Sequence, residues 1–166
     1  MAPSQGLGTP LGPRSLEMTS LITGCTGFVA PHAAAGLRAH FPGLELHGTG
    51  PEPAAPGYPL DGYHPLDLQD RDGVRRLIAT VRPALLLHLA ALSSVAESWR
   101  TPVESFVNNT NIFLNLIDEL RCADSRCRVL SIGSSEEYGL QGGRSGALEE
   151  SLSPNPQSPY AVARVA

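Results

Sequence analysis

The amino-acid sequence predicts a doubly wound α/β fold built on a parallel sheet. Three observations carry this prediction. Short apolar segments alternate with amphipathic segments along residues 19–166, which is the order that right-handed β-α-β crossovers produce. Residues 84–89 form an apolar run that contains only His88 as a polar residue, as in a strand buried on both faces. A glycine-containing turn directly follows the first apolar segment, where such folds pass from the first strand to the first helix.

Length, charge and cysteine usage narrow the class of protein. The chain has 166 residues, enough for one domain with a core, and a formal net charge of −4. This charge favours neither nucleic acid nor an anionic membrane as a partner, and no apolar stretch approaches the ~18 residues of a membrane span. The three cysteines form no CxxC pair, so we expect no metal site and a reducing, cytoplasmic location. Residues 1–17 are rich in Pro, Gly and Ser and are predicted to be a disordered leader before a domain over residues 18–166.

The first half of the domain is predicted to hold three strands and two helices. Residues 19–23 form the first strand, and residues 28–40 form a helix with Pro31 in its first turn. The face of this helix that we expect to be buried carries Val29, Ala33, Gly36 and Leu37. Residues 44–48 and 63–66 are the second and third strands. A second helix follows, because Val74, Leu77, Ile78 and Val81 recur at i, i+3, i+4 and i+7.

The second half continues the alternation. The strand over residues 84–89 precedes a long helix over residues 103–120, and residues 128–132 form a fifth strand. A polar loop over residues 139–157 leads to a last helix that begins near Pro159. The buried stripe of the long helix is predicted to consist of Phe106, Thr110, Phe113, Leu114 and Ile117.

The turn after the first strand reads TGCTGFVA and carries small residues at Gly24, Gly27 and Ala30. Gly24 allows a tight turn, and Gly27 allows a pyrophosphate to approach the backbone at a helix N-terminus. Ala30 is small enough for the helix to pack closely on the strand. A plain chain reversal is the alternative, but the position on the first β-α-β unit favours nucleotide binding.

Several motifs in order resemble the extended short-chain dehydrogenase/reductase family, in particular its NAD-dependent nucleotide-sugar epimerases and dehydratases. They are TGCTGFV (23–29), Asp67-Leu68, HLAA (88–91), SSVAESW (93–99), Asn109, GSSEEYG (133–139) and SPYAVAR (158–164). The sequence resembles most strongly the GDP-mannose 4,6-dehydratases and GDP-4-dehydro-6-deoxymannose reductases, with UDP-hexose 4-epimerases as the nearest competitor. The resemblance implies a Rossmann-like NAD(P)-binding fold, a GDP-linked hexose as substrate, NAD or NADP as cofactor, and a homodimer at full length.

The resemblance also implies roles for individual residues. Tyr160 transfers a proton, Ser134 orients the reacting oxygen, and Arg164 supplies the cation that stabilises a phenolate one helical turn away. Glu136 falls where dehydratases carry a glutamate that removes a proton. The residues assigned to the cofactor are Gly24, Thr26, Gly27, Phe28, Val29, Asp67, Leu68, Leu89, Ala90, Ala91 and Asn109.

Several of these residues also have a purely structural interpretation. Ser134 can simply cap a turn, Asp67 can cap the helix that follows it, and Glu136 can be a solvated surface acid. His88 is predicted to pack in the core. Tyr160 can be an ordinary half-buried aromatic residue.

The sequence departs from the family pattern in four respects. Arg164 replaces the usual lysine, and its planar fork differs in geometry from an ammonium group. Ile112-Phe113 stands where Gly-Thr is usual. No acidic residue ends the second strand, which leaves NAD and NADP undecided. Family members are about twice as long, so the resemblance implies an N-terminal portion that lacks the substrate domain and leaves the fifth strand at the sheet edge.

Three hypotheses about function follow. The first is an NAD(P)-dependent enzyme that modifies a nucleotide-diphosphate sugar by 4-keto reduction, 4,6-dehydration or 4-epimerisation. The second is a non-catalytic nucleotide-binding fragment or pseudoenzyme, which Arg164 and the Ile112-Phe113 replacement favour. The third is a complete single-domain reductase whose substrate site comes from the loop over residues 139–157.

Overall fold

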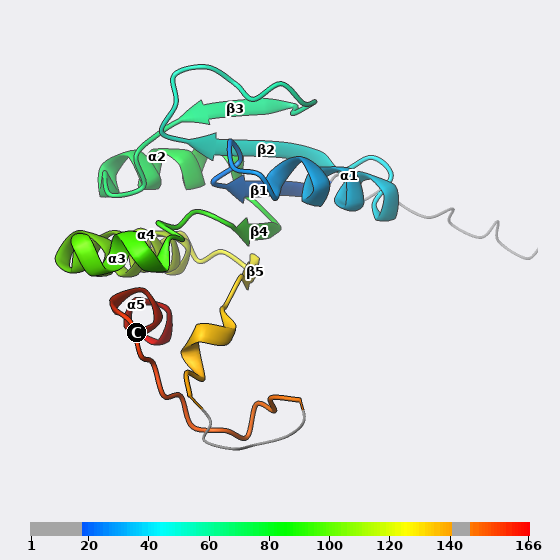
Figure 1. Ribbon diagram of the computed structural model, residues 1–166. Helices are drawn as coiled ribbons and strands as arrows, with labels where there is room; N and C mark the ends of the chain where they lie inside the picture. Colours follow the sequence, from blue (N-terminus) through cyan, green and yellow to red (C-terminus); the bar gives the residue numbers. More distant parts are fainter. Residues whose placement is uncertain (1–17, 141–146) are drawn as a thin grey trace, which may run out of the picture.

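The structure, a computed structural model, describes residues 18–140 and 147–166. The predicted disordered leader over residues 1–17 lies outside the described residues, as does part of the predicted loop, residues 141–146. The described chain forms a five-stranded parallel sheet in the order β3-β2-β1-β4-β5, which Figure 1 shows from top to bottom. The chain winds outward from β1 to β3, then returns to add β4 and β5 on the other side, which confirms the doubly wound fold.

The strands meet at a shared carboxyl edge. They are β1 (Thr19–Thr23), β2 (Glu45–Gly50), β3 (Gly62–Pro65), β4 (Leu85–His88) and β5 (Arg128–Ser131). The register pairs Thr23 of β1 with Thr49 of β2 on one side and with His88 of β4 on the other. These three polar residues therefore lie in a row where the strands end, and all three are buried. In open parallel sheets this edge is where ligands bind.

Consecutive residues of the inner strands enter two different cores. Leu21 and Leu86 join one buried cluster with residues of α2 (Arg71–Val81) and α4 (Pro102–Cys122). Ile22 and Leu87 join a second cluster on the opposite face, against α1 (Ala30–His40). This alternation confirms that β4 is buried on both faces, because successive side chains of a strand point to opposite sides of the sheet.

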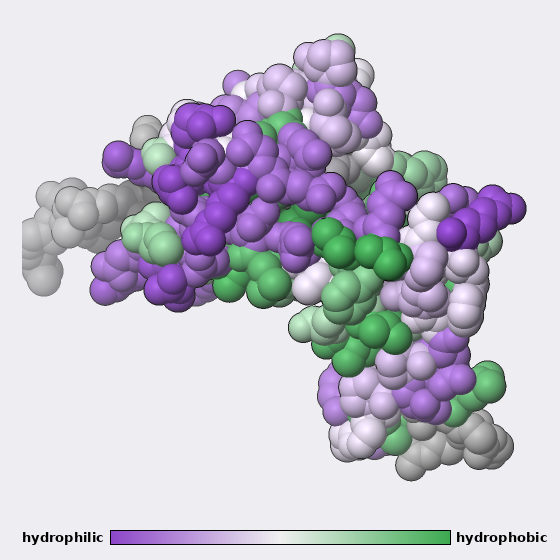
Figure 2. Space-filling view, turned by 90° about the vertical axis from the view of Figure 1, so that its left-hand side faces the viewer, coloured by the Kyte–Doolittle hydropathy of each residue, from purple (hydrophilic) through white to green (hydrophobic). Residues whose placement is uncertain are grey.

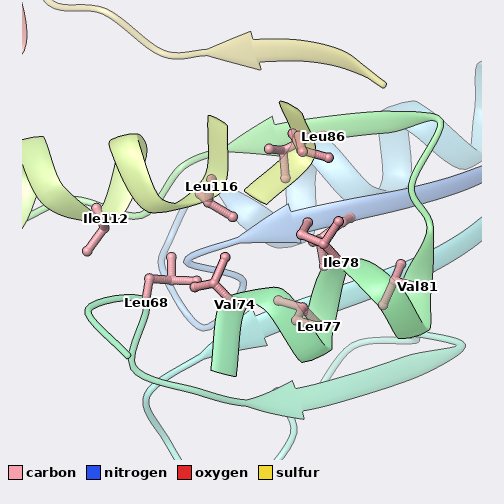
Figure 3. Close-up of a cluster of buried hydrophobic side chains, with 10 residues drawn as sticks. Leu68, Val74, Leu77, Ile78, Val81, Leu86, Ile112 and Leu116 are labelled. Carbon is pink, nitrogen blue, oxygen red and sulfur yellow. The ribbon is translucent and has the colours of Figure 1, made fainter. Parts of the chain in front are cut away.

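The predicted periodicity of α2 is confirmed. Val74, Leu77, Ile78 and Val81 are all buried, and Figure 3 shows them turned toward Leu86 and the α4 residues Ile112 and Leu116. The Asp70 side chain caps α2 by accepting a hydrogen bond from the backbone N–H of Gly73 at 3.1 Å. The cap is therefore Asp70, and the alternative that Asp67 caps this helix is wrong.

The predicted buried stripe of α4 is wrong by about one residue position. The helix buries Ser105, Asn109, Ile112, Leu116, Glu119 and Leu120. Phe106 and Leu114 from the predicted stripe are instead 38% and 55% exposed. Apolar residues occur on two faces of α4, and the sheet takes the face that also carries small and polar residues. Composition alone does not distinguish the two faces.

The predicted buried face of α1 is partly wrong. The helix begins at Ala30, two residues later than predicted, and buries Ala30 and Ala34. Val29 lies in the preceding turn and is 56% exposed, and Gly36 is exposed as well. Ala33 and Leu37 are partly buried against the second core, as expected.

Two short helices were not predicted. The helix α3 (Val95–Arg100) begins where the Ser94 hydroxyl accepts a hydrogen bond from the backbone N–H of Glu97 at 3.1 Å. The 3-10 helix η1 (Ser135–Glu137) has Ser134 as its N-cap, with a reciprocal contact to Glu137. Both carry a serine followed three residues later by a glutamate, which is the signal of a capping box.

A buried carboxylate joins α2 to α4. The Glu119 side chain is only 2% exposed and accepts hydrogen bonds from Arg71 Nε at 2.7 Å and Arg75 Nε at 3.1 Å. Hydrogen bonds from Arg71 and then Arg75 lower the pKa of Glu119, although burial acts in the opposite direction. Both arginines thus face α4, so neither is free to bind a phosphate at the strand ends.

The sheet ends at β5, as the resemblance implies. All four residues of β5 are exposed, and the side chains of Val129 and Leu130 are 37% and 56% exposed. The last helix, α5 (Pro159–Val165), begins at Pro159 as predicted and packs against α4. Among residues 18–140 and 147–166, no helix combines the length and hydropathy that crossing a bilayer requires.

Candidate functional site

A cavity of about 570 Å³ lies at the carboxyl ends of β1 and β4. Its walls come from the turn after β1, the segments after β2, β3, β4 and β5, and the helices α4 and α5. The chain reverses its winding direction between β1 and β4, and such a switch point is the usual ligand crevice of an open α/β sheet. Of the residues predicted to bind cofactor or act in catalysis, those in the wall are Gly24, Thr26, Gly27, Phe28, Val29, Asp67, Leu68, Leu89, Ala90, Ala91, Tyr160 and Arg164.

The turn after β1 requires a glycine at position 24. Gly24 has a φ of +65°, a conformation that L side chains rarely adopt. A Cβ at this position would lie 2.7 Å from the backbone nitrogen of Ala90 and 2.8 Å from its Cα. The turn therefore passes directly over the segment after β4, and this leaves a backbone-lined surface between the two strands.

The same turn presents backbone to the cavity at Gly27. The Gly27 N–H donates to the carbonyl of Gly24 at 3.0 Å, and α1 begins three residues later at Ala30. Phe28 and Val29 line the cavity and are 87% and 56% exposed, so nothing in the described chain covers them. A helix that begins at an exposed, glycine-containing turn presents the positive end of its dipole to an anion.

The segment after β3 brings Asp67 and Leu68 to the opposite wall. Asp67 Oδ1 accepts a hydrogen bond from the backbone N–H of Gln69 at 2.9 Å, and the Asp67 carbonyl accepts from Asp70. These bonds shape the turn before α2 while Asp67 remains exposed at the cavity. Asp67 thus shapes the turn and is also placed to accept a hydrogen bond from a ligand.

Tyr160 and Arg164 reach the cavity from α5. They lie one helical turn apart, and the tyrosine is 9% exposed. The helix is held by the Ser158 hydroxyl, which accepts a hydrogen bond from the backbone N–H of Ala161 at 3.1 Å. A buried N-cap that fixes the first turn of α5 also fixes the direction in which Tyr160 leaves it.

Three of the predicted residues do not line the cavity. Ser134 and Glu136 lie at η1, where the Ser134 hydroxyl accepts a hydrogen bond from the backbone N–H of Glu136 at 3.2 Å. Glu136 is exposed, whereas Ser134 is partly buried and follows Gly133, which does line the cavity. Asn109 clamps the loop after β4, because its side chain donates to the Leu92 carbonyl and accepts from the Leu92 N–H.

The cavity residues outside the predicted site include two with titratable side chains, Glu52 and His88. Glu52 follows the end of β2, and its Oε2 would lie 3.0 Å from a Cβ added at Gly50, beside Thr26. The predicted second strand ends at Gly48, so Glu52 does not fall at a strand end in the sequence. His88 was predicted to pack in the core, and it is 2% exposed, yet it also lines the cavity. The sequence signal for His88 is its place near the end of a buried strand, which the structure ends at His88.

The Ile112-Phe113 replacement affects this wall directly. Ile112 lines the cavity and is 4% exposed, and the Phe113 ring lies 5.5 Å from the His88 ring. Burial, followed by the charge of Arg164, lowers the pKa of His88 to about 4. The imidazole is therefore neutral at pH 7.

Curated relatives match most of this chain but less than half of their own length. The chain is 32% identical to the GDP-6-deoxy-D-mannose reductase of Pseudomonas aeruginosa over 146 residues, which are 87% of this chain and 43% of the relative. It is 28% identical to the UDP-glucose 4-epimerase of Rhizobium leguminosarum bv. trifolii over 151 residues, which cover 86% and 42% of the two chains.

Solved structures share the fold. The UDP-glucose 4-epimerase of Thermus thermophilus, in complex with NAD, matches with a TM-score of 0.75 and 31% identity over 89% of this chain and 47% of that chain. RMD from Pseudomonas aeruginosa, complexed with NADPH, matches with a TM-score of 0.70 and 28% identity over 90% and 45%. The family model of the NAD dependent epimerase/dehydratase family matches residues 20–166. The chain therefore belongs to the NAD-dependent epimerase/dehydratase family.

Proposed function

We propose that the chain carries the cofactor half and the acid/base residues of an enzyme that modifies a nucleotide-diphosphate sugar. The reaction is a 4-keto reduction, a 4,6-dehydration or a 4-epimerisation with hydride transfer to or from NAD(P). The observation that carries this proposal is the shared cavity: Tyr160 and Arg164 of α5 line the same space as Gly24 and Gly27 after β1. A GDP-linked hexose is the proposed substrate, supported by the 32% identity to a GDP-6-deoxy-D-mannose reductase.

The residues present fit a dinucleotide. A Cβ at Gly24 would fill part of the surface between β1 and β4, and the glycine keeps that surface open to a pyrophosphate beside the start of α1. When bound, the nicotinamide ring supplies the hydride acceptor or donor. Ala90, Ala91 and Ile112 line the same cavity, and the two alanines are small enough to leave room for a ring there.

Proton transfer is the proposed role of Tyr160. Oxidation or reduction at a sugar carbon moves a proton off or onto the attached oxygen, and a phenol can do this when a cation favours its ionised form. Arg164 provides that cation from one turn further along α5. The Ser134 hydroxyl already accepts the Glu136 N–H, so its own proton stays available to orient the reacting oxygen.

Substituting Tyr160 with phenylalanine tests the proposal. We expect Tyr160→Phe in the full-length protein to bind NAD(P) normally and to lose at least about a hundredfold in kcat, the usual contribution of a general acid/base. Hydride transfer followed by the absorbance of the reduced cofactor, with separate titration of cofactor binding, gives both quantities. Full activity of the variant would show that the proposed mechanism is wrong.

The same measurements decide the alternative function. A non-catalytic nucleotide-binding protein is the second candidate, because Arg164 stands in place of lysine. In addition, Ile112, which lines the cavity, is larger than the glycine usual at this position. Cofactor binding by the wild-type protein without turnover of any nucleotide sugar would select this alternative. The chain spans less than half of its relatives, so the measurement is made on the complete gene product.

NAD is the cofactor that the end of β2 favours. Glu52 lies beside Gly50 and lines the cavity, where an acidic side chain can accept hydrogen bonds from the adenosine ribose hydroxyls. The carboxylate would repel the 2′-phosphate of NADP. The Tyr63 hydroxyl donates to the Glu52 carbonyl at 2.5 Å, which holds this loop against the sheet.

We expect Glu52→Gln to lower the preference for NAD over NADP about tenfold, since one hydrogen bond to a charged group is lost and one repulsion disappears. Dissociation constants of both cofactors, measured by fluorescence titration, give the ratio. Glu45→Gln is the matched control, because Glu45 is at the opposite end of the same strand. An unchanged ratio in Glu52→Gln would remove Glu52 from the ribose site.

The full-length protein is further proposed to be a homodimer. An apolar groove between α3, α4 and α5 is lined by Trp99, Val103, Phe106, Val107 and Val162, all of them exposed. Figure 2, viewed from the side of these helices, shows hydrophobic residues gathered between the larger upper body and the smaller lower lobe. Sedimentation of the full-length protein at a monomer mass would contradict the proposal.

A further inference from the structure

Two buried nitrogen atoms in the wall of the cavity lack hydrogen-bond partners among the residues that the structure describes. One is Nε2 of His88 and the other is Nε of Arg164. Both residues line the same cavity. Burial lowers the pKa of the His88 imidazole, and the positive charge of Arg164 lowers it further. Buried polar atoms are nearly always paired in folded proteins, so two unpaired ones in one cavity call for an explanation.

The surroundings of His88 determine which ring nitrogen carries the proton. His88 Nδ1 lies 2.7 Å from Thr23 Oγ1, and the same oxygen accepts a hydrogen bond from the Ala90 N–H at 3.3 Å. With the proton on Nε2, a buried N–H without an acceptor would sit near the Arg164 cation, and the two would repel. With the proton on Nδ1, the ring donates to Thr23 and Nε2 presents a lone pair, which the cation attracts. The second tautomer leaves no imidazole N–H without an acceptor and turns the Nε2 lone pair, rather than a proton, toward the cation.

We propose that His88 is a positioning residue for Arg164, with the Nε2 lone pair accepting a hydrogen bond from the Nε–H of the guanidinium in the dinucleotide-bound protein. The two atoms are a complementary acceptor and donor, and each is unpaired within the described part of the chain. Hydrogen bonds of this kind are often long in unliganded sites and tighten once the ligand is bound. This inference rests on the proposed dinucleotide site.

Such a contact explains how an arginine can stand where the family has a lysine. A lysine offers one terminal nitrogen, whereas an arginine has Nε on its stem and two further nitrogens at its tip. If His88 holds Nε, the two terminal nitrogens stay free for the cofactor and for Tyr160. A neutral imidazole also anchors the guanidinium without neutralising its charge, which a carboxylate in the same place would do.

Two amide substitutions of His88 separate its two nitrogens. The asparagine amide reaches the position of Nδ1 and keeps the bond to Thr23, whereas the glutamine amide reaches the position of Nε2 and keeps an acceptor for Arg164. In the full-length protein we expect His88→Gln to bind NAD within about threefold of wild type and His88→Asn to bind about tenfold more weakly, the effect of one hydrogen bond to a charged group. In an Arg164→Lys background we expect the two variants to bind NAD equally, because the Nε–H is gone.

Equal affinities of the two variants in the wild-type background would overturn the proposal, and so would a difference that persists unchanged with Arg164→Lys. Thermal unfolding of each variant identifies any that fail to fold. A second measurement needs no variant of His88: nitrogen-15 shifts of the His88 ring in the wild-type protein with NAD bound. An unprotonated Nε2 that responds to Arg164→Lys supports the proposal, and a protonated or unresponsive Nε2 overturns it. If wild type binds no dinucleotide, the proposed function fails, whereas NAD binding with an unresponsive Nε2 overturns only the proposed role of His88.

Discussion

Gly24→Ala is expected to lower the free energy of unfolding by about 2–5 kcal/mol and to abolish measurable dinucleotide binding. Two effects add. An alanine at a φ of +65° is strained by about 1–2 kcal/mol, as left-handed backbone is for any L residue. Its Cβ would also lie 2.7 Å from the backbone nitrogen of Ala90, and overpacking of this kind typically costs a further 1–3 kcal/mol, roughly. If the turn moves away from β4 to avoid this contact, the surface proposed to bind the pyrophosphate is lost.

Two other glycines provide controls for Gly24→Ala. Gly43 has a φ of +85° and open space around its Cα, so Gly43→Ala carries only the backbone strain, about 1–2 kcal/mol. Gly36 lies inside α1 with open space, so Gly36→Ala should stabilise the protein by up to about 1 kcal/mol. Chemical denaturation and cofactor titration measure both properties. If Gly24→Ala unfolds no more easily than Gly43→Ala, the close approach to Ala90 has no energetic weight.

Leu116→Ala is expected to destabilise the fold by about 3 kcal/mol, within the range of large-to-small substitutions in cores. Leu116 is 0% exposed and lies in the cluster that joins α4 to α2, β1 and β4, opposite Leu86 (Figure 3). Four elements contribute side chains to this cluster, so none of them can close the space without losing another contact. The cavity therefore stays largely open, and the loss approaches its full value.

Leu114→Ala is the matched control for Leu116→Ala. It lies on the same helix, removes the same atoms, and starts from a side chain that is 55% exposed. We expect its effect on the free energy of unfolding to be below about 1 kcal/mol, because little apolar surface returns to water. The sequence alone assigns Leu114 to the buried stripe, so a larger loss for Leu114→Ala than for Leu116→Ala would reverse the orientation of α4.

Short sequence patterns predict an element correctly where a single physical requirement determines its structure. The four apolar residues of α2 recur at helical spacing and are all buried, because this helix has only one apolar face. The α4 prediction failed for the opposite reason: apolar residues lie on two faces of that helix, and only tertiary packing chooses between them. The sequence also predicts the end of β2 two residues too early, at Gly48 instead of Gly50. Gly48 usually weakens a strand, but β2 continues to Gly50 because it is paired on both sides, by β1 and β3.

The candidate site was predictable to the extent that its residues follow strand ends. Gly24, Asp67 and Ala90 each come soon after a strand, and the parallel sheet brings all three to one cavity. Glu52 was missed because the strand boundary before it was wrong. Asn109 was assigned to the cofactor, yet its amide is taken up by both backbone groups of Leu92, and no spacing rule on one helix reveals a partner 17 residues away.

The strand order has a consequence for how the chain folds. The central strand β1 pairs with β2 about one helix later, but its other neighbour, β4, is far along the chain, with Ser20 opposite Leu85. The entropy cost of closing that long loop must be met before the stabilising contacts between β1 and β4 can form. Parallel sheets therefore form slowly. During synthesis, β1 therefore emerges with one side unpaired and stays so until α2 and β4 have been made. The surface between Gly24 and Ala90 therefore forms only when β4 pairs with β1, and β5 is added to the edge of the sheet after that.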